Sequence, residues 1–447
     1  MAPYTVIIIG AGLAGLSAAW EVQQAGGHPI VLEARTRVGG RVFTLRDGFH
    51  QGQYAEGGGE FIEVFHHRML GLARQFDMSL EEVPNRATEA YWLALEGKVG
   101  AATDAALWGV DLSSELEQPW VALAELGKAV PDPTHPDQAP SAAILDRDSA
   151  ANWLSSLKAH PLAKKAFAAR LRSEFLLELE AYSLLDLARW GAYYYNRPAE
   201  HHPAYRLVGG NDQLPKALAR LLPDVRLNSP VTAIRQTDAG VRITYRVDKV
   251  FHHLDGDYAI LAIPLKPAQQ IEFDPPLPEA QRALIHDLHY GAVTKVLLQY
   301  RRRFWQEHEW NGNLLSDRPF TTIWHPTVTQ TGGCGILTVY TGAAAGVKFS
   351  AMSEAERITT AVAEIEALFP GSAQWLCAAR TLAWSNEPYA QGGYAGFQVG
   401  AVTTHWQTLR QPAGRVHFAG EHAADHQGYM EGAVESGQRA AGEIMRR

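Results

Sequence analysis

The order of hydrophobic and polar residues in the first 45 positions predicts a strand, a helix and a second strand. Thr5–Ile9 is a continuous apolar run rich in β-branched residues, which is typical of a strand buried on both faces. Leu13–Gln24 is rich in alanine, has helical spacing and is followed by two glycines that end it. Residues 29–32 are the next apolar run, which ends at Glu33. A strand–helix–strand unit of this kind predicts an α/β fold with a parallel sheet.

The remainder of the chain divides by pattern into helical and strand-rich parts. Residues 77–205 have long helical patterns with many Trp and Tyr, whereas residues 206–264 return to short strands and turns. Residues 291–384 are mixed, and a last strand and helix follow. The later elements expected are strands at 231–234, 241–245, 258–263, 295–300, 336–340 and 415–418, and a helix at 428–445. Two domains, each assembled from separated segments, account for this order.

The composition narrows the classes of function. The chain has 447 residues, of which 46% are hydrophobic, so it can form two or three domains and is not a disordered protein. Its 40 Lys and Arg against 48 Asp and Glu give a formal charge of −8, which argues against nucleic acid as a partner. No targeting segment and no run of about 18 apolar residues is visible, so we expect a cytoplasmic protein without membrane association.

Cysteine and histidine give no sign of a metal centre. Cys334 and Cys377 are too few for a disulfide framework or a cysteine-rich metal site. Histidines are paired at 66–67, 201–202 and 252–253, but no pair has flanking ligands at a spacing known for metal sites. We therefore expect structural or surface roles for these histidines and no bound metal.

A glycine-rich turn lies between the first predicted strand and helix. Gly10, Gly12 and Gly15 form a G-x-G-x-x-G pattern. In such a turn the first glycine permits the tight bend, the second lets the backbone approach a pyrophosphate, and the third allows close packing of helix on strand. The helix N-terminus then faces the phosphate charge, and Glu33 stands where a carboxylate can bind a ribose diol. The segment predicts a dinucleotide-binding domain of the Rossmann type.

Further motifs occur in order along almost the whole chain. They are Glu33-Ala34-Arg35 followed by Gly39-Gly40-Arg41, the glycine turn Gly58-Gly59-Glu60-Phe61 leading into a helix, Gly209-Gly210 before Leu214, Val231 after Pro230, Lys295 in an apolar strand, Trp384 opening W-S-N-E-P-Y, Gly420-Glu421, and Gly428-Tyr429-Met430 before Gly432-Ala433. Together these motifs resemble those of the flavin-containing amine oxidases, the monoamine oxidase-like family.

The resemblance implies FAD as the cofactor and two discontinuous domains. Residues 1–76, 206–290 and 386–447 are expected to form the Rossmann-type FAD-binding domain, and residues 77–205 and 291–385 a mixed α+β substrate-binding domain. The residues implied to contact FAD are Gly10, Gly12, Leu13, Ala14, Gly15, Glu33, Ala34, Arg35, Gly39, Gly40, Arg41, Gly58, Gly59, Glu60, Phe61, Val231, Trp384, Gly420, Glu421, Gly428, Tyr429, Met430 and Ala433.

The resemblance also implies oxidative deamination of a primary amine. In that reaction flavin N5 takes a hydride from the carbon bearing nitrogen, the imine hydrolyses to an aldehyde or ketone and ammonia, and O2 becomes H2O2. Family members carry a lysine, here Lys295, that reaches the flavin through a water and assists the reoxidation of reduced flavin by oxygen. A cation there would stabilise the negative charge that develops during that step. Trp384 would stack near the flavin, and Tyr429 would form one wall of the amine pocket.

Two positions depart from the monoamine oxidases. Tyr394 stands where their flavin-linking cysteine lies, so we expect FAD to be noncovalent. Ala395 stands where their second aromatic wall lies, so this wall is absent or comes from Tyr394 or Phe397. The predicted substrate pocket therefore contains Tyr394, Ala395, Phe397 and Tyr429.

The sequence leaves the substrate open. An L-amino-acid oxidase would need an arginine for the substrate carboxylate, for which Arg68, Arg172 and Arg189 are candidates. A polyamine oxidase would need pocket carboxylates, for which Glu60, Glu63, Glu174 and Glu178 are candidates. Two alternatives are more remote. One is a related enzyme that oxidises C–C bonds, as desaturases do. The other is a binding protein without redox chemistry, because the Rab GDP-dissociation inhibitors resemble this architecture. The expected partners are a small amine or amino acid and O2, and a homodimer is one assembly that the sequence allows.

Overall fold

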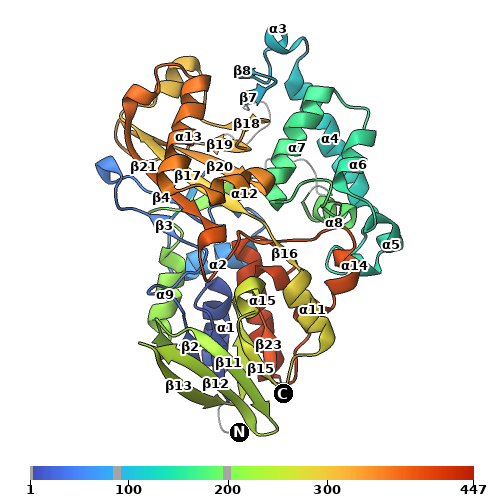
Figure 1. Cartoon of the computed structure of the whole chain (residues 1–447), viewed down its shortest axis with the longest axis vertical. Coiled ribbons are helices and arrows are strands. Elements are labelled where there is room, and N and C mark those ends of the chain that lie inside the picture. The colour runs from blue at the N-terminus through green and yellow to red at the C-terminus, as the bar shows by residue number, and fades with distance from the viewer. Residues whose placement is uncertain (1–3, 84–91, 195–202, 447) are drawn as a thin grey trace.

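The lower half of the molecule in Figure 1 is built on a five-stranded parallel sheet with the strand order β10-β2-β1-β14-β23. The computed structural model describes residues 4–83, 92–194 and 203–446. The strands are β1 (Thr5–Ile9), β2 (His28–Leu32), β10 (Val225–Arg226), β14 (Tyr258–Leu261) and β23 (Val416–Phe418). The prediction of a parallel sheet from the first 45 residues is confirmed, and β1 has the predicted bounds.

Both faces of this sheet are covered, as the apolar run of β1 predicts. Val6 and Ile8 pack into a core with helices α1 (Leu13–Gln24) and α15 (Met430–Met445). Ile7 and Ile9 point the other way, into a core shared with a four-stranded sheet of order β13-β12-β11-β15. Its strands are β11 (Val231–Thr237), β12 (Gly240–Val247), β13 (Val250–Gly256) and β15 (Glu272–Asp274).

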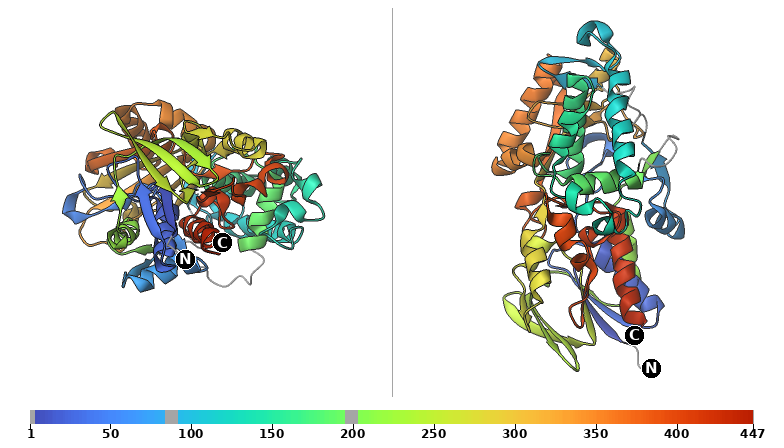
Figure 2. Two further views of the ribbon diagram at one scale, coloured as in Figure 1. Left: turned by 90° about the horizontal axis from the view of Figure 1, so that it is seen from below. Right: turned by 90° about the vertical axis from the view of Figure 1, so that its right-hand side faces the viewer.

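The upper half is built on a seven-stranded sheet of order β21-β17-β20-β19-β18-β7-β8. Its strands are β7 (Trp92–Leu95), β8 (Lys98–Ala101), β17 (Val293–Tyr300), β18 (Leu314–Ser316), β19 (Thr322–Trp324), β20 (Gly335–Gly342) and β21 (Leu376–Ala383). Helices α12 (Ala343–Ala351) and α13 (Glu354–Leu368) pack on one face, and α7 (Pro161–Phe175) packs on the other (Figure 2). Beyond α7 lie α4 (Leu112–Gly127), α6 (Ala150–Ser156) and α8 (Leu184–Tyr194).

Short elements connect the two halves. A three-stranded sheet joins β5 (Ile62–Glu63), β9 (Ala204–Leu207) and β6 (Leu80–Glu82). The other strand pairs are β3 (Thr44–Leu45) with β4 (Ala55–Glu56) and β16 (His289–Tyr290) with β22 (Ala395–Gly396). The remaining α-helices are α2 (His67–Gln75), α3 (Ala105–Trp108), α5 (Ala142–Leu145), α9 (Gln213–Leu221), α10 (Leu265–Ala268), α11 (Glu279–Asp287) and α14 (Ala401–His405).

The structure departs from the sequence-based expectation in two places. The glycine turn at 58–61 leads into strand β5, and helix α2 begins only at His67. The segment 77–205, expected to be helical, contains the hairpin β7–β8, which joins the large sheet through β18.

The strands of the parallel sheet all come from the segments predicted together for the FAD-binding domain, while the domain boundaries themselves stay predictions. Within the described ranges, no helix combines the length and the apolar character needed to cross a membrane.

Candidate active site

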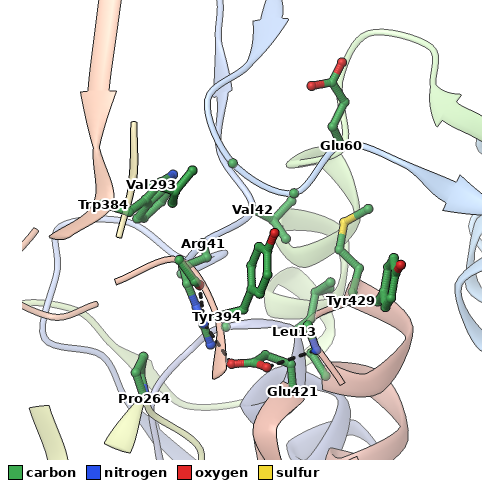
Figure 3. A pocket seen from close by; sticks show the side chains of 18 of the residues that line it. Leu13, Arg41, Val42, Glu60, Pro264, Val293, Trp384, Tyr394, Glu421 and Tyr429 are labelled. Carbon is green, nitrogen blue, oxygen red and sulfur yellow. Dashed lines mark hydrogen bonds and ion pairs between the residues drawn. The ribbon is translucent and has the colours of Figure 1, made fainter. Parts of the chain in front are cut away.

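A cavity of about 780 Å³ lies between the carboxyl ends of the parallel strands and the seven-stranded sheet. Figure 3 shows some of the residues that line it. Ile9, Leu32 and Ala262 line it at the ends of β1, β2 and β14, whereas Thr322 and Tyr340 line it from the large sheet. In open α/β sheets, ligands bind outside the carboxyl ends of the strands. The cavity therefore lies where a dinucleotide is expected and continues into a second chamber.

The glycine turn leaves room for a ligand at one position only. Gly10 has φ of +104°, and a Cβ there would lie 2.7 Å from Ala262 O, so the bend requires glycine. A Cβ at Gly15 would lie 1.9 Å from Gly10 O, so this glycine serves helix–strand packing and does not line the cavity. A Cβ at Gly12 would have no neighbour within 4 Å. The open space over Gly12 at the N-terminus of α1 fits the pyrophosphate of a dinucleotide.

Two carboxylates organise the cofactor end of the cavity. Glu33 is buried and accepts hydrogen bonds from Ala11 N (2.8 Å) and Arg35 N (2.9 Å), which leaves acceptor capacity for a ribose. Glu421 pairs with Arg41 (2.9 Å) and accepts from Gly428 N (3.1 Å). The pair therefore ties the Gly39-Gly40-Arg41 motif to the C-terminal motif, and Figure 3 shows both residues at the cavity.

Most residues predicted from sequence lie on this one cavity. Of the predicted cofactor residues, those lining it are Gly10, Gly12, Leu13, Ala14, Glu33, Ala34, Arg35, Gly39, Gly40, Arg41, Gly58, Gly59, Glu60, Phe61, Val231, Trp384, Gly420, Glu421, Gly428, Tyr429, Met430 and Ala433. Lys295, Tyr394 and Ala395 also line it. Gly15 does not.

Two tyrosines form walls of the inner chamber (Figure 3). The Tyr394 hydroxyl donates to Ser173 O (3.1 Å), and the Tyr429 hydroxyl donates to the Glu174 carboxylate. Burial raises the pKa of both phenols well above their usual range, so neither acts as a base. The last turn of α7 thus fixes both rings, a role for Ser173 and Glu174 that no sequence motif indicated.

Phe397 does not belong to the pocket. Its side chain is fully buried, packs against Trp406 at 5.4 Å between ring centroids and lies in the core below the cavity. Phe397 lies beyond the end of β22 (Ala395–Gly396), so the alternation of side chains along that strand does not extend to it, and its ring turns into the core. Further aromatic lining comes from Trp324 and Tyr340, whose centroids are 5.4 Å apart and which the sequence analysis did not single out.

Lys295 reaches the cavity because of the alternation along β17. Val296, Leu298 and Tyr300 pack into the core with α13, so Lys295 faces the opposite side of the sheet. The lysine is buried, with 4% of its surface exposed. Its ammonium donates to Glu56 O (3.0 Å), Gly58 O (2.9 Å) and the Glu60 carboxylate (2.9 Å).

Glu60 is the centre of a buried charge cluster. Its Oε1 accepts hydrogen bonds from Arg206 Nε (3.0 Å) and Trp324 Nε1 (2.8 Å), while Oε2 accepts from Lys295. Burial alone would raise the pKa of Glu60, but the Lys295 and Arg206 charges outweigh it, so its pKa lies below the usual value. Glu60 therefore lines the cavity as a carboxylate anion that is already paired with two cations, Lys295 and Arg206.

Glu56 behind this cluster gives a prediction on stability. Burial raises the pKa of Glu56 to about 7, against the opposing hydrogen bond from Asn211 N. The folded protein therefore binds more protons than the unfolded chain between about pH 4.5 and 7, and its free energy of unfolding falls as pH rises through that window. The glutamine of Glu56→Gln cannot ionise, so the free energy of unfolding of this variant should fall less than that of the wild type between about pH 5 and about pH 8. The difference between the two losses should be about 3 kcal/mol at most. Melting temperatures of both proteins at the two pH values test this, and equal losses would contradict it.

The arginines proposed for a substrate carboxylate are already bonded within the protein. Arg68 pairs with Glu431 (3.3 Å) and Arg172 with Glu178 (2.6 Å), and neither arginine lines the cavity. Arg189 lines it but pairs with Asp186 (2.7 Å) and donates to Asp425 O (2.9 Å). The structure instead brings Arg170 and Arg206 to the chamber, both missed from sequence.

The candidate carboxylates divide differently. Glu60, Glu63 and Glu174 line the cavity, whereas Glu178 does not and pairs with Arg172. Glu174 also pairs with Arg170 (2.9 Å). For the part of the chain that the structure describes, no group of His, Cys, Asp and Glu side chains is arranged to hold a metal ion. The pair His201-His202 lies outside the described residues.

A comparison with protein families assigns the chain. The model described as flavin containing amine oxidoreductase matches residues 13–445. The chain belongs to this family. It is thus an FAD-dependent oxidoreductase that acts on amines, and the open space over Gly12 and the buried Glu33 fit its cofactor.

Relatives of this amine oxidoreductase differ in the substrates that their names state. An L-amino-acid oxidase of Demansia vestigiata is 28% identical over 99% of this chain and 87% of its own length. The flavin-containing amine oxidase B of Homo sapiens is 28% identical over 98% and 86%. The structure of cyclohexylamine oxidase from Brevibacterium oxydans IH-35A superposes with a TM-score of 0.87, is 26% identical and covers 99% of both chains.

Neither cysteine of this amine oxidoreductase lines the cavity that would hold the flavin. The chain has two cysteines, and neither Cys334 nor Cys377 lines the cavity, whereas Tyr394 does. FAD is therefore held without a covalent bond. Acid precipitation of the purified protein should release the yellow colour into the supernatant in an amount equal to the protein. Flavin that sediments with the pellet would contradict this expectation.

Proposed function

We propose that this amine oxidoreductase deaminates a primary amine that carries no carboxylate beside the reacting carbon. Bound FAD would accept the hydride, with O2 as the final acceptor and H2O2 as product. The residues of the chain would orient and desolvate the neutral amine, which needs no strong protein base. Tyr394 and Tyr429 would hold it between their rings, and Trp384 would support the cofactor from the side.

One observation carries this proposal. The arginines on the substrate side of the cavity, Arg170, Arg189 and Arg206, each pair with a carboxylate of the protein at 2.7 to 2.9 Å. A substrate carboxylate would have to displace one of these anions and leave it buried without its partner. Breaking a buried pair costs about 3–5 kcal/mol, which exceeds what one new pair usually returns. The described residues therefore favour an amine over an amino acid.

A second candidate is a diamine or polyamine. Glu63 and Glu174 line the inner chamber, and a carboxylate there could pair with a distant ammonium of the substrate. Glu174, however, is already bonded to Arg170 and Tyr429. We therefore place this candidate after the monoamine.

Matched substrates separate these candidates in a peroxide assay. Phenylethylamine and L-phenylalanine differ only in the carboxylate, and pentylamine and 1,5-diaminopentane differ only in the second amine. We expect kcat/KM to be at least about 100-fold higher for phenylethylamine than for L-phenylalanine, equivalent to about 2.7 kcal/mol. A preference for L-phenylalanine would overturn the proposal. A preference for the diamine over pentylamine would favour the second candidate.

A further inference from the structure

The ammonium of Lys295 has no donor to spare. A lysine ammonium has three N–H donors. Those of Lys295 go to Glu56 O, Gly58 O and the Glu60 carboxylate, all within 3.0 Å. The family resemblance predicts a lysine that holds a water near the flavin. Here the Glu60 carboxylate takes the third donor, so the protein itself fixes the position of the Lys295 charge.

The carboxylate that takes this donor is held by side chains from three other segments. Glu60 follows the glycine turn of the cofactor half, while Arg206 lies on β9, Lys295 on β17 and Trp324 on β19. Both carboxylate oxygens are bonded, and 3% of the side chain is exposed. The ring of Trp324 also lies 5.1 Å from the Lys295 ammonium. Lys295, Arg206 and Glu60 therefore form one rigid cluster at the wall of the cavity.

The charges of this cluster do not cancel. Two cations and one anion leave one net positive charge beside the cavity. Glu56, the next carboxyl, has its pKa raised to about 7 by burial, so it adds only part of a negative charge at neutral pH. Charges act more strongly in a closed protein site than in water because the effective dielectric constant is lower. Glu60 thus removes half of the positive charge that Lys295 and Arg206 would otherwise present.

We propose that Glu60 is a positioning residue that fixes Lys295 and limits its positive charge, so that the pair sets the reduction potential of FAD. The proposal rests on FAD as the cofactor and is independent of the substrate. A reduced flavin carries more negative charge than an oxidised one, so a cation nearby raises the reduction potential and an anion lowers it. Glu60 and Lys295 should therefore act on the potential with opposite signs.

The test compares Glu60→Gln, Lys295→Met and the double variant as holoenzymes without substrate. A spectroscopic redox titration gives the midpoint potential of FAD, and the affinity for sulfite, an anion that adds to oxidised flavin, reports the same charge. We expect Glu60→Gln to bind sulfite about tenfold more tightly and to have a potential about 30 mV higher for the two-electron couple. Lys295→Met should shift both quantities by a similar amount in the opposite direction. The double variant should lie between the two.

Glu63→Gln is the matched control, because Glu63 lines the same cavity and the three hydrogen bonds that the Lys295 ammonium donates go to Glu56, Gly58 and Glu60. It should shift the potential less than Glu60→Gln. A potential that falls in Glu60→Gln, or that stays unchanged, would overturn the proposal and leave Glu60 a structural support. If Glu60→Gln does not retain FAD, Arg206→Met removes a cation of the same cluster with Glu60 in place. It should lower the potential, and an unchanged value would also overturn the proposal.

Discussion

Gly12→Val should give a folded protein that no longer binds FAD. Gly12 has φ of −74°, which valine tolerates, and an added Cβ would meet no protein atom within 4 Å. The branched side chain would instead fill the open space over the N-terminus of α1, where the cofactor's pyrophosphate must approach the backbone. We expect FAD affinity to fall by at least about 100-fold, which corresponds to about 2.7 kcal/mol. Equilibrium titration of the apoprotein with FAD measures it.

Two other glycines serve as controls for this experiment. Gly333 also has open space at its Cβ but lies outside the cavity, so Gly333→Val should bind FAD normally. Gly15→Ala would push a methyl group into Gly10 O, so it should lower the melting temperature itself. A Gly12→Val protein with a full complement of flavin would place the cofactor elsewhere.

Lys295→Met should slow the reaction of reduced flavin with oxygen far more than the reduction of flavin by substrate. The lysine supplies a fixed charge in a closed site, and removing it should cost the oxygen step about 10- to 100-fold, or about 1.4–2.7 kcal/mol. Hydride removal depends on the neutral amine and its alignment, so it should change less. Methionine keeps the length of the side chain, and Glu60 retains Arg206 and Trp324. Stopped-flow measurement of each half-reaction gives the two rates.

The comparison for this variant is Lys266→Met, which removes a half-buried lysine of α10 outside the cavity. It should leave both half-reactions unchanged. Equal slowing of both steps by Lys295→Met would indicate a collapsed cavity. No slowing of either step would make Lys295 a structural residue only.

The fold was predictable where local pattern decides it. The strand, turn and helix of residues 5–24 follow from apolar runs and glycines that act within a few positions, and their bounds agree with the structure. The hairpin β7–β8 was missed because its place in the sheet depends on pairing with β18, about 220 residues later in the chain. Such pairing is stabilised by tertiary contacts that a local window does not contain.

The site was predictable where a motif is local and was not where distant side chains meet. Gly10, Gly12 and Glu33, whose spacing predicts contacts with the cofactor, line the cavity. Arg206 and Trp324 sit in segments without a motif, and only the fold brings them to Glu60. The resemblance predicts Glu60 as a contact of the cofactor, but it does not indicate that the Glu60 carboxylate pairs with Lys295 and Arg206. Charge pairing across separate segments cannot be read from either segment alone.

The packing of α15 on α1 has a consequence for how the protein is made. Gly437 on α15 lies so close to α1 that a Cβ there would be 2.1 Å from Ala14 O. The cofactor end of the cavity is lined both by Gly10 and by residues between Gly420 and Ala433. A ribosome delivers the first of these residues more than 400 positions before the last. Until then α1 packs on β1, β2 and α9, but the part of its core that α15 supplies is missing. We therefore expect FAD to bind only after translation is complete, and the part of α1 that α15 covers to stay exposed on the nascent chain until then.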